Sequence, residues 1–261
     1  MNETNEEHTH VVSTRFEFGS LIQRLKADRL IKRFKQDATF LPSTTQLRLA
    51  FNLDHEDSIH PYWNHLVRGL SGSHEILTQE YIQALANYLV DRMTEIEAET
   101  GKFGNIVEVG AGDGQLAFFL NQALKNKSKI TIIPTDAKIG WIEESKFEVE
   151  KADVLAALSK HVPSIVICSW MPEGIDWTDA FANTPGVREY ILIGNPDHTG
   201  KHNYSWENHS LLEFRQVNLV DISSFQLARF LGTVRTDRER RTLDARGAIK
   251  YPSRTVAFRR L

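Results

Sequence analysis

The chain of 261 residues is predicted to adopt an α/β fold, in which helices cover both faces of a mostly parallel sheet. Two observations predict it. After Gly101, short runs rich in β-branched residues alternate with stretches of helical periodicity, as buried parallel strands and their crossover helices do. The run 106–109 also ends in a turn with glycine at every second position, where an expected strand meets an apolar, helix-compatible run.

The first part of the chain is predicted to lie outside this sheet. Residues 1–14 are polar and acidic, and we expect a disordered tail there. Residues 15–75 are predicted to be a helical extension or lid. Apolar residues between 16 and 35 follow helical spacing, and basic residues occupy the remaining faces. A loop containing Pro42 is expected next, followed by a segment rich in aromatic residues and histidine.

Residues 76–261 are predicted to form the core domain. Its first element is a helix over 78–99, for which Thr78 is the N-cap candidate. Short apolar runs then predict the strands 105–112, 129–136, 164–170, 188–196, 213–222 and 253–261. The helices expected among them are 114–126, 139–147, 153–161, 176–183 and 223–231.

Composition narrows the class of protein. The net charge of −3 and the pI near 6.4 give no overall attraction to nucleic acid or to anionic membranes. No apolar run approaches the roughly 20 residues needed to cross a bilayer, so no membrane partner is expected. Because Cys168 is the one cysteine, an internal disulfide framework is excluded. We expect the cytoplasm as the compartment, and the nucleus stays open.

The spacing of the glycines indicates the kind of ligand. Open α/β sheets bind ligands beyond the carboxyl ends of their strands, where glycine permits positive φ and close approach of the backbone. The glycines stand at 110, 112 and 114. A dinucleotide fingerprint would need a further glycine where Gln115 stands, and a Gly-Lys-Ser/Thr phosphate loop is absent. A nucleotide-like ligand is therefore predicted, held by neither of these two motifs.

The stretch from Glu108 to Gly114 resembles the first motif of the class I, Rossmann-like S-adenosylmethionine-dependent methyltransferases. The resemblance covers about residues 75–261. Asp136 ends the next strand, where the family places an acid on the ribose hydroxyls, and Asp153 matches the acid that accepts from the adenine amino group. The resemblance implies a doubly wound, seven-stranded sheet with S-adenosylmethionine as cofactor and S-adenosylhomocysteine as product. The cofactor-binding residues expected from it are Glu108, Gly110, Ala111, Gly112, Gly114, Asp136, Ala137, Ala152, Asp153, Val154, Ser169 and Trp170.

Each acid also has a simpler interpretation. A carboxylate such as that of Asp136 can accept two hydrogen bonds from vicinal hydroxyls, but it could instead cap a helix at a loop entrance. Asp153 could cap the helix 153–161. Glu108 is expected to be buried within a strand and to accept from backbone donors of the glycine turn. In the family, this acid can also reach the methionine amino group. "RGLSGSHE", 68–75, could offer backbone N–H groups and Arg68 to the methionine carboxylate, or could be a plain connection.

Methyl transfer from a sulfonium requires mainly that nucleophile, methyl carbon and sulfur are held in line. A general base is needed only where the nucleophile must lose a proton. The candidates for the catalytic set are Trp170, Glu173, His198 and His202. The segment "SWMP" departs from the Asp/Asn-Pro-Pro-Tyr pattern of many amine and amide methylators, so it does not support N-methylation of amides or bases. Alternatively, Trp170 only packs in the wall of the site, and the two histidines are ordinary residues of surface loops. No metal site is expected.

A small-molecule methyl acceptor is favoured, bound by residues of the extension and of two loops. The expected substrate-binding residues are Tyr62, Trp63, His65, Met171 and Tyr204. Nucleic acid stays a less favoured partner: basic residues gather in 24–35 and 235–250, but acids interleave the second cluster. Methylation of RNA or protein, and a non-catalytic member of the fold, are the alternatives. The sequence leaves the acceptor atom and the oligomeric state open.

Overall fold

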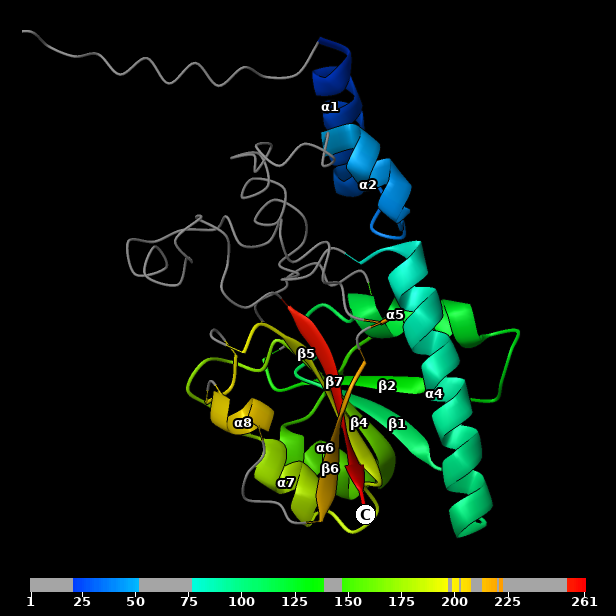
Figure 1. Cartoon of the computed structure of the whole chain (residues 1–261), viewed down its shortest axis with the longest axis vertical. Coiled ribbons are helices and arrows are strands. Elements are labelled where there is room, and N and C mark those ends of the chain that lie inside the picture. The colour runs from blue at the N-terminus through cyan, green and yellow to red at the C-terminus, as the bar shows by residue number, and fades with distance from the viewer. Residues whose placement is uncertain are drawn as a thin grey trace, which may run out of the picture.

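A computed structural model describes residues 21–51, 77–138, 147–196, 199–201, 203–207, 213–219, 221–222 and 253–261. Its seven strands form one sheet in the order β3-β2-β1-β4-β5-β7-β6 (Figure 1). The strands are β1 Asn105–Val109, β2 Ile132–Asp136, β3 Glu150–Lys151, β4 Pro163–Ser169, β5 Glu189–Gly194, β6 Phe214–Asn218 and β7 Arg254–Arg260. All neighbours pair in parallel except β7, which is antiparallel to β5 and to β6. The predicted mostly parallel, seven-stranded sheet is confirmed.

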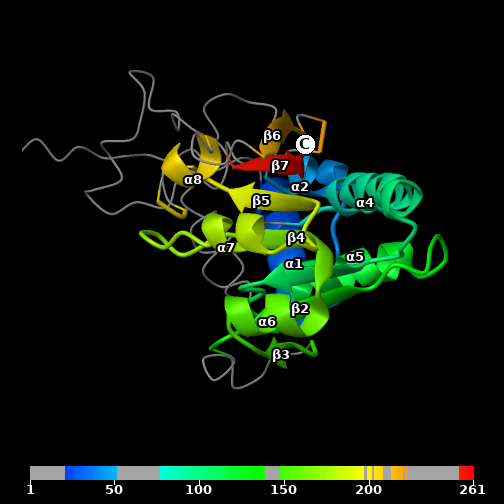
Figure 2. The ribbon, with the colours of Figure 1, turned by 90° about the horizontal axis from the view of Figure 1, so that it is seen from below.

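Helices cover both faces of the sheet (Figure 2). The helices of the core are α4 Gln79–Thr100, α5 Gln115–Leu124, α6 Val154–His161, α7 Thr178–Asn183 and α8 Asn203–Glu207. Alternate residues of a strand point to opposite faces, and β1 follows this rule. Ile106 joins a core with α4 and α5, whereas Val107 joins a core with α6 and α7. The doubly wound arrangement is confirmed.

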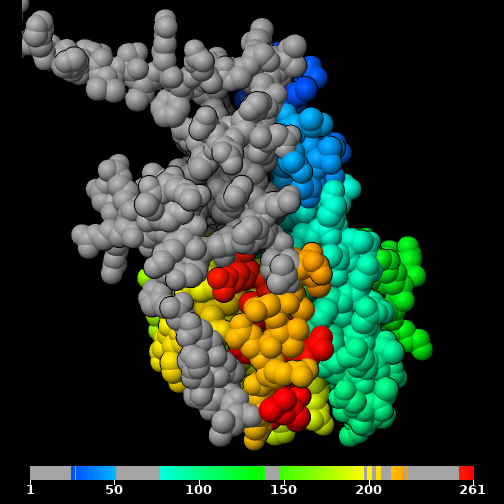
Figure 3. All heavy atoms as spheres, in the orientation of Figure 1, coloured from blue at the N-terminus to red at the C-terminus, as the bar shows by residue number. Residues whose placement is uncertain are grey.

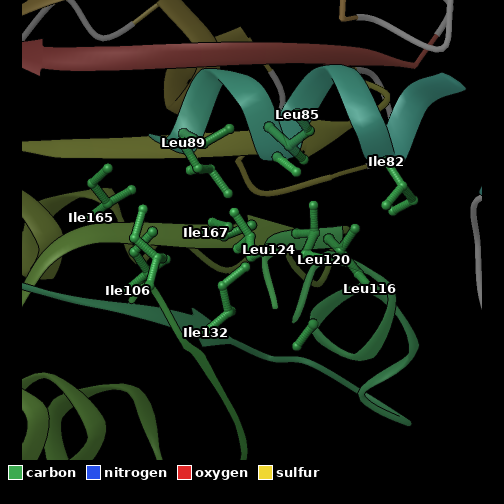
Figure 4. Close-up of a cluster of buried hydrophobic side chains, with 14 of the residues drawn as sticks. Ile82, Leu85, Leu89, Ile106, Leu116, Leu120, Leu124, Ile132, Ile165 and Ile167 are labelled. Atoms are coloured by element: carbon green, nitrogen blue, oxygen red, sulfur yellow. The ribbon is translucent and has the colours of Figure 1, made fainter. Parts of the chain in front are cut away.

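The core between the sheet and α4 and α5 is built from branched aliphatic side chains (Figure 4). Leu85 and Leu89 of α4 are fully buried, as is Leu120 of α5. Helix α4 begins at Thr78, whose hydroxyl accepts from the Tyr81 N–H at 3.2 Å, and ends at Gly101 with φ of 67°. Because only four residues join α4 to β1, the helix runs antiparallel to the strand. Its first turn therefore lies at the carboxyl end of β1.

Helices α1 Leu21–Gln36 and α2 Thr44–Phe51 pack on each other and are fixed to the first turn of α4 (Figures 1 and 3). The backbone N–H of Gln79 donates to the Pro42 carbonyl at 2.9 Å, and its side chain donates to the Leu41 carbonyl. The N–H and the hydroxyl of Thr44 both donate to Glu80 Oε2, at 2.8 and 3.0 Å. The hairpin of α1 and α2 therefore lies toward the carboxyl ends of the parallel strands.

Three elements differ from the sequence-based expectation, and the first of them, α8, occupies residues that were not predicted to be helical. Helix α2 occupies a stretch that was expected to be loop. Ser43 and Gln46 form a capping box there, with reciprocal side-chain bonds of 3.1 and 2.8 Å, and this Ser-x-x-Gln pattern is visible in the sequence. Strand β3, only two residues long, is too short to produce a pattern. The tail 1–14 and the helices expected at 139–147 and 223–231 fall largely or wholly outside the described residues.

Candidate functional site

The glycine turn after β1 holds three glycines with positive φ, and each has a different neighbour. An ideal Cβ at Gly110 would lie 3.0 Å from Cζ3 of Trp177, and one at Gly114 would lie 2.6 Å from Cγ2 of Val149. At Gly112 no atom of the described residues would come within 4 Å of it. Gly110 and Gly114 are therefore required by packing within the protein. Gly112 is the glycine whose backbone a ligand can approach.

Asp136 ties the end of β2 to this turn. Its Oδ2 accepts from the Gly112 N–H at 3.0 Å, and its Oδ1 accepts from the Lys138 N–H at 2.7 Å. The Ala111 N–H also donates to the Thr135 carbonyl at 3.0 Å. Each carboxylate oxygen can accept a second hydrogen bond, so vicinal hydroxyls could still bind. The structure brings Asp136 beside the glycine turn, and its role toward a ribose stays a prediction.

The end of β3 adjoins the end of β2. The Ala152 N–H donates to the Asp136 carbonyl at 3.1 Å, and Val154 is the first residue of α6. Asp153 is the N-cap of α6: its Oδ1 accepts from the Ala156 N–H at 2.8 Å. The helix-cap interpretation of Asp153 is thus present in the structure. The adenine role would use the other oxygen, Oδ2, and stays a prediction. Ala137 is exposed beside these strand ends.

Glu108 is buried within β1, 2% exposed. Its Oε2 accepts from the Ala117 N–H at 3.1 Å. The expected donor was the glycine turn itself, and this expectation is wrong. Gly114 has no side chain with which to cap α5, so the carboxyl of Glu108 satisfies a free N–H in the first turn of that helix.

Burial raises the pKa of Glu108 to about 8, and the nearby carboxylates of Asp113 and Asp136 add to the rise. Burial also raises the pKa of Asp113. Three acids thus lie close together at the end of β1. The one backbone hydrogen bond to Glu108 lowers its pKa, but by less than burial raises it. A cationic ligand group beside Glu108 would favour its ionised form.

The segment after β4 begins with an unusual backbone conformation. Ser169 ends the strand, and Trp170 follows with φ of 55°, which costs a bulky residue about 1–2 kcal/mol. The N–H of Trp170 donates to the Ile193 carbonyl at 2.7 Å, which holds this turn against β5. Met171 is buried, 4% exposed, whereas Glu173 is exposed. Glu173 is therefore accessible to a bound molecule.

The segments after β4 and β5 form one unit. The Gly200 N–H donates to the Met171 carbonyl at 3.1 Å, and the Gly174 N–H donates to the Gly200 carbonyl at 2.8 Å. Trp206 of α8 donates from Nε1 to the Thr199 hydroxyl at 3.0 Å. Tyr204, also on α8, is 49% exposed. These hydrogen bonds therefore connect the segment that holds Met171 with the helix that carries Tyr204, and together the two segments form one wall beside the strand ends.

Trp177 is a residue that the sequence argument did not single out. Its ring packs on Gly110, and its backbone N–H donates to the sulfur of Met171 at 3.4 Å. It therefore connects the glycine turn to the wall formed after β4 and β5. The nearest sequence signal was the segment "SWMP", which ends five residues before Trp177. Its contact with Gly110 joins residues far apart in sequence and leaves no local pattern.

No family model matches the chain, and no curated protein matches it in sequence. Among solved structures, the plantazolicin methyltransferase BpumL, in complex with a triazolic desmethylPZN analogue and SAH, is 11% identical. The alignment covers 92% of this chain and 98% of that chain, with a TM-score of 0.33. The citrinin polyketide synthase CMeT domain is 9% identical over 91% of this chain and 66% of that chain, with a TM-score of 0.36.

The assignment of the fold rests on the sheet itself, because these TM-scores lie below 0.5. Five parallel strands in the order β3-β2-β1-β4-β5, followed by an antiparallel β7 inserted between β5 and β6, form the doubly wound, seven-stranded sheet that the resemblance to the class I methyltransferases implies. The chain has a Rossmann-like α/β fold.

Several predicted site residues lie outside the described residues. They are Tyr62, Trp63, His65, Arg68, His198 and His202, and their roles stay predictions. Among the residues that the structure describes, no group of three or more His, Cys, Asp or Glu side chains could hold a metal ion. No described helix is both long enough and apolar enough to span a membrane.

Proposed function

We propose that the chain is an S-adenosylmethionine-dependent methyltransferase that transfers a methyl group to an O or N atom of a small-molecule acceptor. One observation carries the proposal. No described atom blocks the approach of a ligand to the backbone of Gly112, and the Gly112 N–H donates to the carboxylate of Asp136. An accessible backbone and a carboxylate at a strand end therefore lie side by side. A nucleoside needs this pairing, because its hydroxyls require an acceptor while its sugar lies flat against the chain.

The cofactor would lie across the carboxyl ends of β1, β2 and β4. Asp136 would accept from the ribose hydroxyls, and Oδ2 of Asp153 would accept from the adenine amino group. Glu108 would face the methionine amino group, either directly or through the first turn of α5, and Arg68 would face its carboxylate. The raised pKa of Glu108 supports this assignment, because a buried acid with a single backbone donor favours a cation nearby.

The cofactor supplies an activated methyl group on a positive sulfur, and the protein's contribution is alignment and the handling of one proton. Trp170 would present its ring to the sulfonium or to the acceptor. Met171 and Tyr204 would form the acceptor wall, together with Tyr62, Trp63 and His65. Glu173, His198 or His202 would accept the proton of the acceptor. The exposure of Glu173 supports its inclusion.

The extension 15–75 would act as the lid of this site. Its support is the attachment of α1 and α2 to the first turn of α4, toward the carboxyl ends of the strands. Limited proteolysis with and without S-adenosylhomocysteine tests the lid. Protection of sites within 15–75 by the ligand supports it, whereas identical cleavage and full activity after truncation to residue 70 would exclude it.

We expect the protein in the cytoplasm, or in the nucleus, because its one thiol, Cys168, is buried and unpaired.

Isothermal titration calorimetry with S-adenosylmethionine tests the cofactor. Asp136→Ala should weaken binding by about 1.5–3 kcal/mol, the scale of a charge-assisted hydrogen bond. Asp136→Asn keeps one oxygen for the Gly112 N–H and should lose less. Asp91→Ala, on the exposed side of α4, is the matched control and should bind as the wild type does. If Asp136→Ala binds as tightly as the control, the strand-end acid does not hold the cofactor.

Labelled-methyl transfer into fractions of a cell extract tests the acceptor. Label in the small-molecule fraction supports the proposal. Label in RNA or in protein would show that the acceptor is a macromolecule and not a small molecule. Cofactor binding without any transfer would indicate a non-catalytic member of the fold.

A further inference from the structure

One face of α1 carries a concentration of positive charge that the proposed methyl transfer does not use. Five basic side chains are exposed on this helix: Lys26, Arg29, Lys32, Arg33 and Lys35. A single acid, Asp28, lies among them. Among the residues that the structure describes, none of the five makes an ion pair, although the whole chain has a net charge of −3. We call these five side chains the basic face.

The basic face is turned away from the hairpin's own packing. Leu30, Ile31 and Phe34 are partly buried on the opposite side of α1, and Phe34 packs edge-on against Phe40 at 5.2 Å. Arg33 alone has a contact within the hairpin, with its guanidinium 4.0 Å from the Phe40 ring. The other four cations are exposed with no partner among the described residues, so they are available to a second molecule.

Part of the charge pattern works against the helix, although Arg33 and Lys35 lie in its last turn, where the helix dipole favours positive charge. Lys26 and Arg29 are three residues apart, as are Lys32 and Lys35, and Arg29 and Arg33 are four apart. Like charges at these spacings destabilise a helix by about 0.2–0.5 kcal/mol per pair. A face evolved only for solubility would alternate charges of both signs. The repulsion along α1 would be relieved by a polyanion.

We propose that the basic face docks the phosphate backbone of single-stranded RNA. An anionic membrane is disfavoured because Leu30, Ile31 and Phe34 already pack within the hairpin, which leaves Leu25 as the one exposed apolar side chain among those that the structure describes on α1. A duplex is stiff, with a persistence length of about 150 base pairs, and meets a convex helix over a short distance. A flexible single strand can follow the basic side chains on both flanks, and RNA is the nucleic acid commonly met as single strands, loops and ends.

The place of the basic face gives this docking a consequence. The hairpin is fixed to the first turn of α4, toward the carboxyl ends of the parallel strands. RNA bound to α1 would therefore lie toward the same end of the molecule as the glycine turn. The inference does not require methyl transfer, because binding is measured without cofactor or acceptor.

Fluorescence anisotropy of a labelled single-stranded RNA with the full chain tests the docking. The test variant is Lys26→Gln, Arg29→Gln, Lys32→Gln, which spares the Arg33 contact. The matched control is Lys102→Gln, Lys125→Gln, Lys129→Gln, which removes the same charge from exposed positions at the opposite end of the sheet. Wild type and control should bind alike. The test variant should bind at least about tenfold more weakly, with a salt slope lower by about 2.

Three results would overturn the proposal. Test and control variants could lose affinity equally, or the wild type could fail to bind RNA at about 50 mM salt. A DNA duplex, phosphatidylserine vesicles or polyglutamate could bind more tightly than RNA to the wild type, which would assign the face to that partner. Unchanged circular dichroism and thermal unfolding in both variants check that they are folded, and a separate calorimetric titration with S-adenosylhomocysteine distinguishes this proposal from that of the methyltransferase function.

Discussion

Two buried glutamates occupy opposite ends of the same sheet and differ in the partners of their carboxylates. Glu189, at the start of β5, is fully buried and has three side-chain partners: Tyr88 donates to Oε1 at 2.5 Å, Arg92 Nε donates to Oε2 at 2.6 Å, and Arg259 Nε lies 3.2 Å from Oε2. Glu108, near the end of β1, is buried to the same degree and accepts one backbone hydrogen bond, from Ala117.

The difference separates a structural end of the sheet from the end at which we propose that the ligand binds. At the amino end of β5, two arginines compensate the carboxylate, and its ring of partners is closed by the bond from Arg259 to Tyr88 at 3.0 Å. Burial raises the pKa of both carboxyls; at Glu189 the bond from Tyr88 and the two arginines oppose the rise, whereas no described cation contacts Glu108 at the carboxyl end of β1. A buried carboxyl at a strand end that no cation of the protein contacts can be neutralised by a cationic group of a ligand.

The largest effect is expected at the structural end. Glu189→Gln would leave Arg92 and Arg259 buried or half-buried without their shared counter-charge. Removing one partner of a buried ion pair destabilises proteins by about 3–5 kcal/mol, and we expect that loss in urea unfolding. The control is Glu95→Gln, which removes the exposed second partner of Arg92 and should change stability by less than about 1 kcal/mol. Equal losses in the two variants would contradict the special place of Glu189.

Glu108 should make stability depend on pH. Its pKa is about 8 in the folded chain, against 4.5 as the ordinary value, so the folded state holds a proton that the unfolded state releases. The stabilisation is complete below pH 4.5 and is lost as the pH rises through 8. The total change is on the order of 5 kcal/mol.

Unfolding at several pH values measures this dependence. Glu108→Gln carries no proton to release, so the difference in stability between wild type and variant should shift in favour of the variant as pH rises. Saturating S-adenosylhomocysteine should flatten the dependence, because its ammonium group would favour the ionised carboxylate. A wild type whose pH dependence equals that of Glu108→Gln would show that this carboxyl ionises as it does in water.

The two ends also hold matched glycines. Gly101 and Gly112 have φ of 67° and 59°, and no described atom would come within 4 Å of an added Cβ at either. Valine at either position would carry similar backbone strain, about 1–2 kcal/mol. Gly112→Val should also abolish most cofactor binding, with a loss exceeding that of Asp136→Ala, whereas Gly101→Val should bind normally. Tight binding by Gly112→Val in calorimetry would refute the claim that a ligand lies against this glycine.

The sequence could predict the elements whose signals are local. The strand runs, the glycine turn and the acid at the end of β2 follow from short patterns, and the contact between Gly112 and Asp136 follows from the parallel pairing of two strand ends. Three features could not be predicted in the same way. Trp177 reaches Gly110 through space, Ala117 supplies the donor of Glu108, and β3 is two residues long. Each depends on tertiary packing, which overrides local preference.

The smallest effect concerns Asp153, which lies at the ligand end and caps α6. Asp153→Ser keeps a hydroxyl that can accept from the Ala156 N–H, so α6 and the free energy of unfolding should change little. It removes the second carboxylate oxygen, and we expect cofactor binding to weaken by about 1 kcal/mol because the adenine amino group loses its acceptor. Asp153→Ala removes both functions and should also lower stability by about 1 kcal/mol. If the serine variant binds S-adenosylmethionine as the wild type does, Asp153 is a helix cap alone and the ligand end contains one nucleoside-binding acid, Asp136.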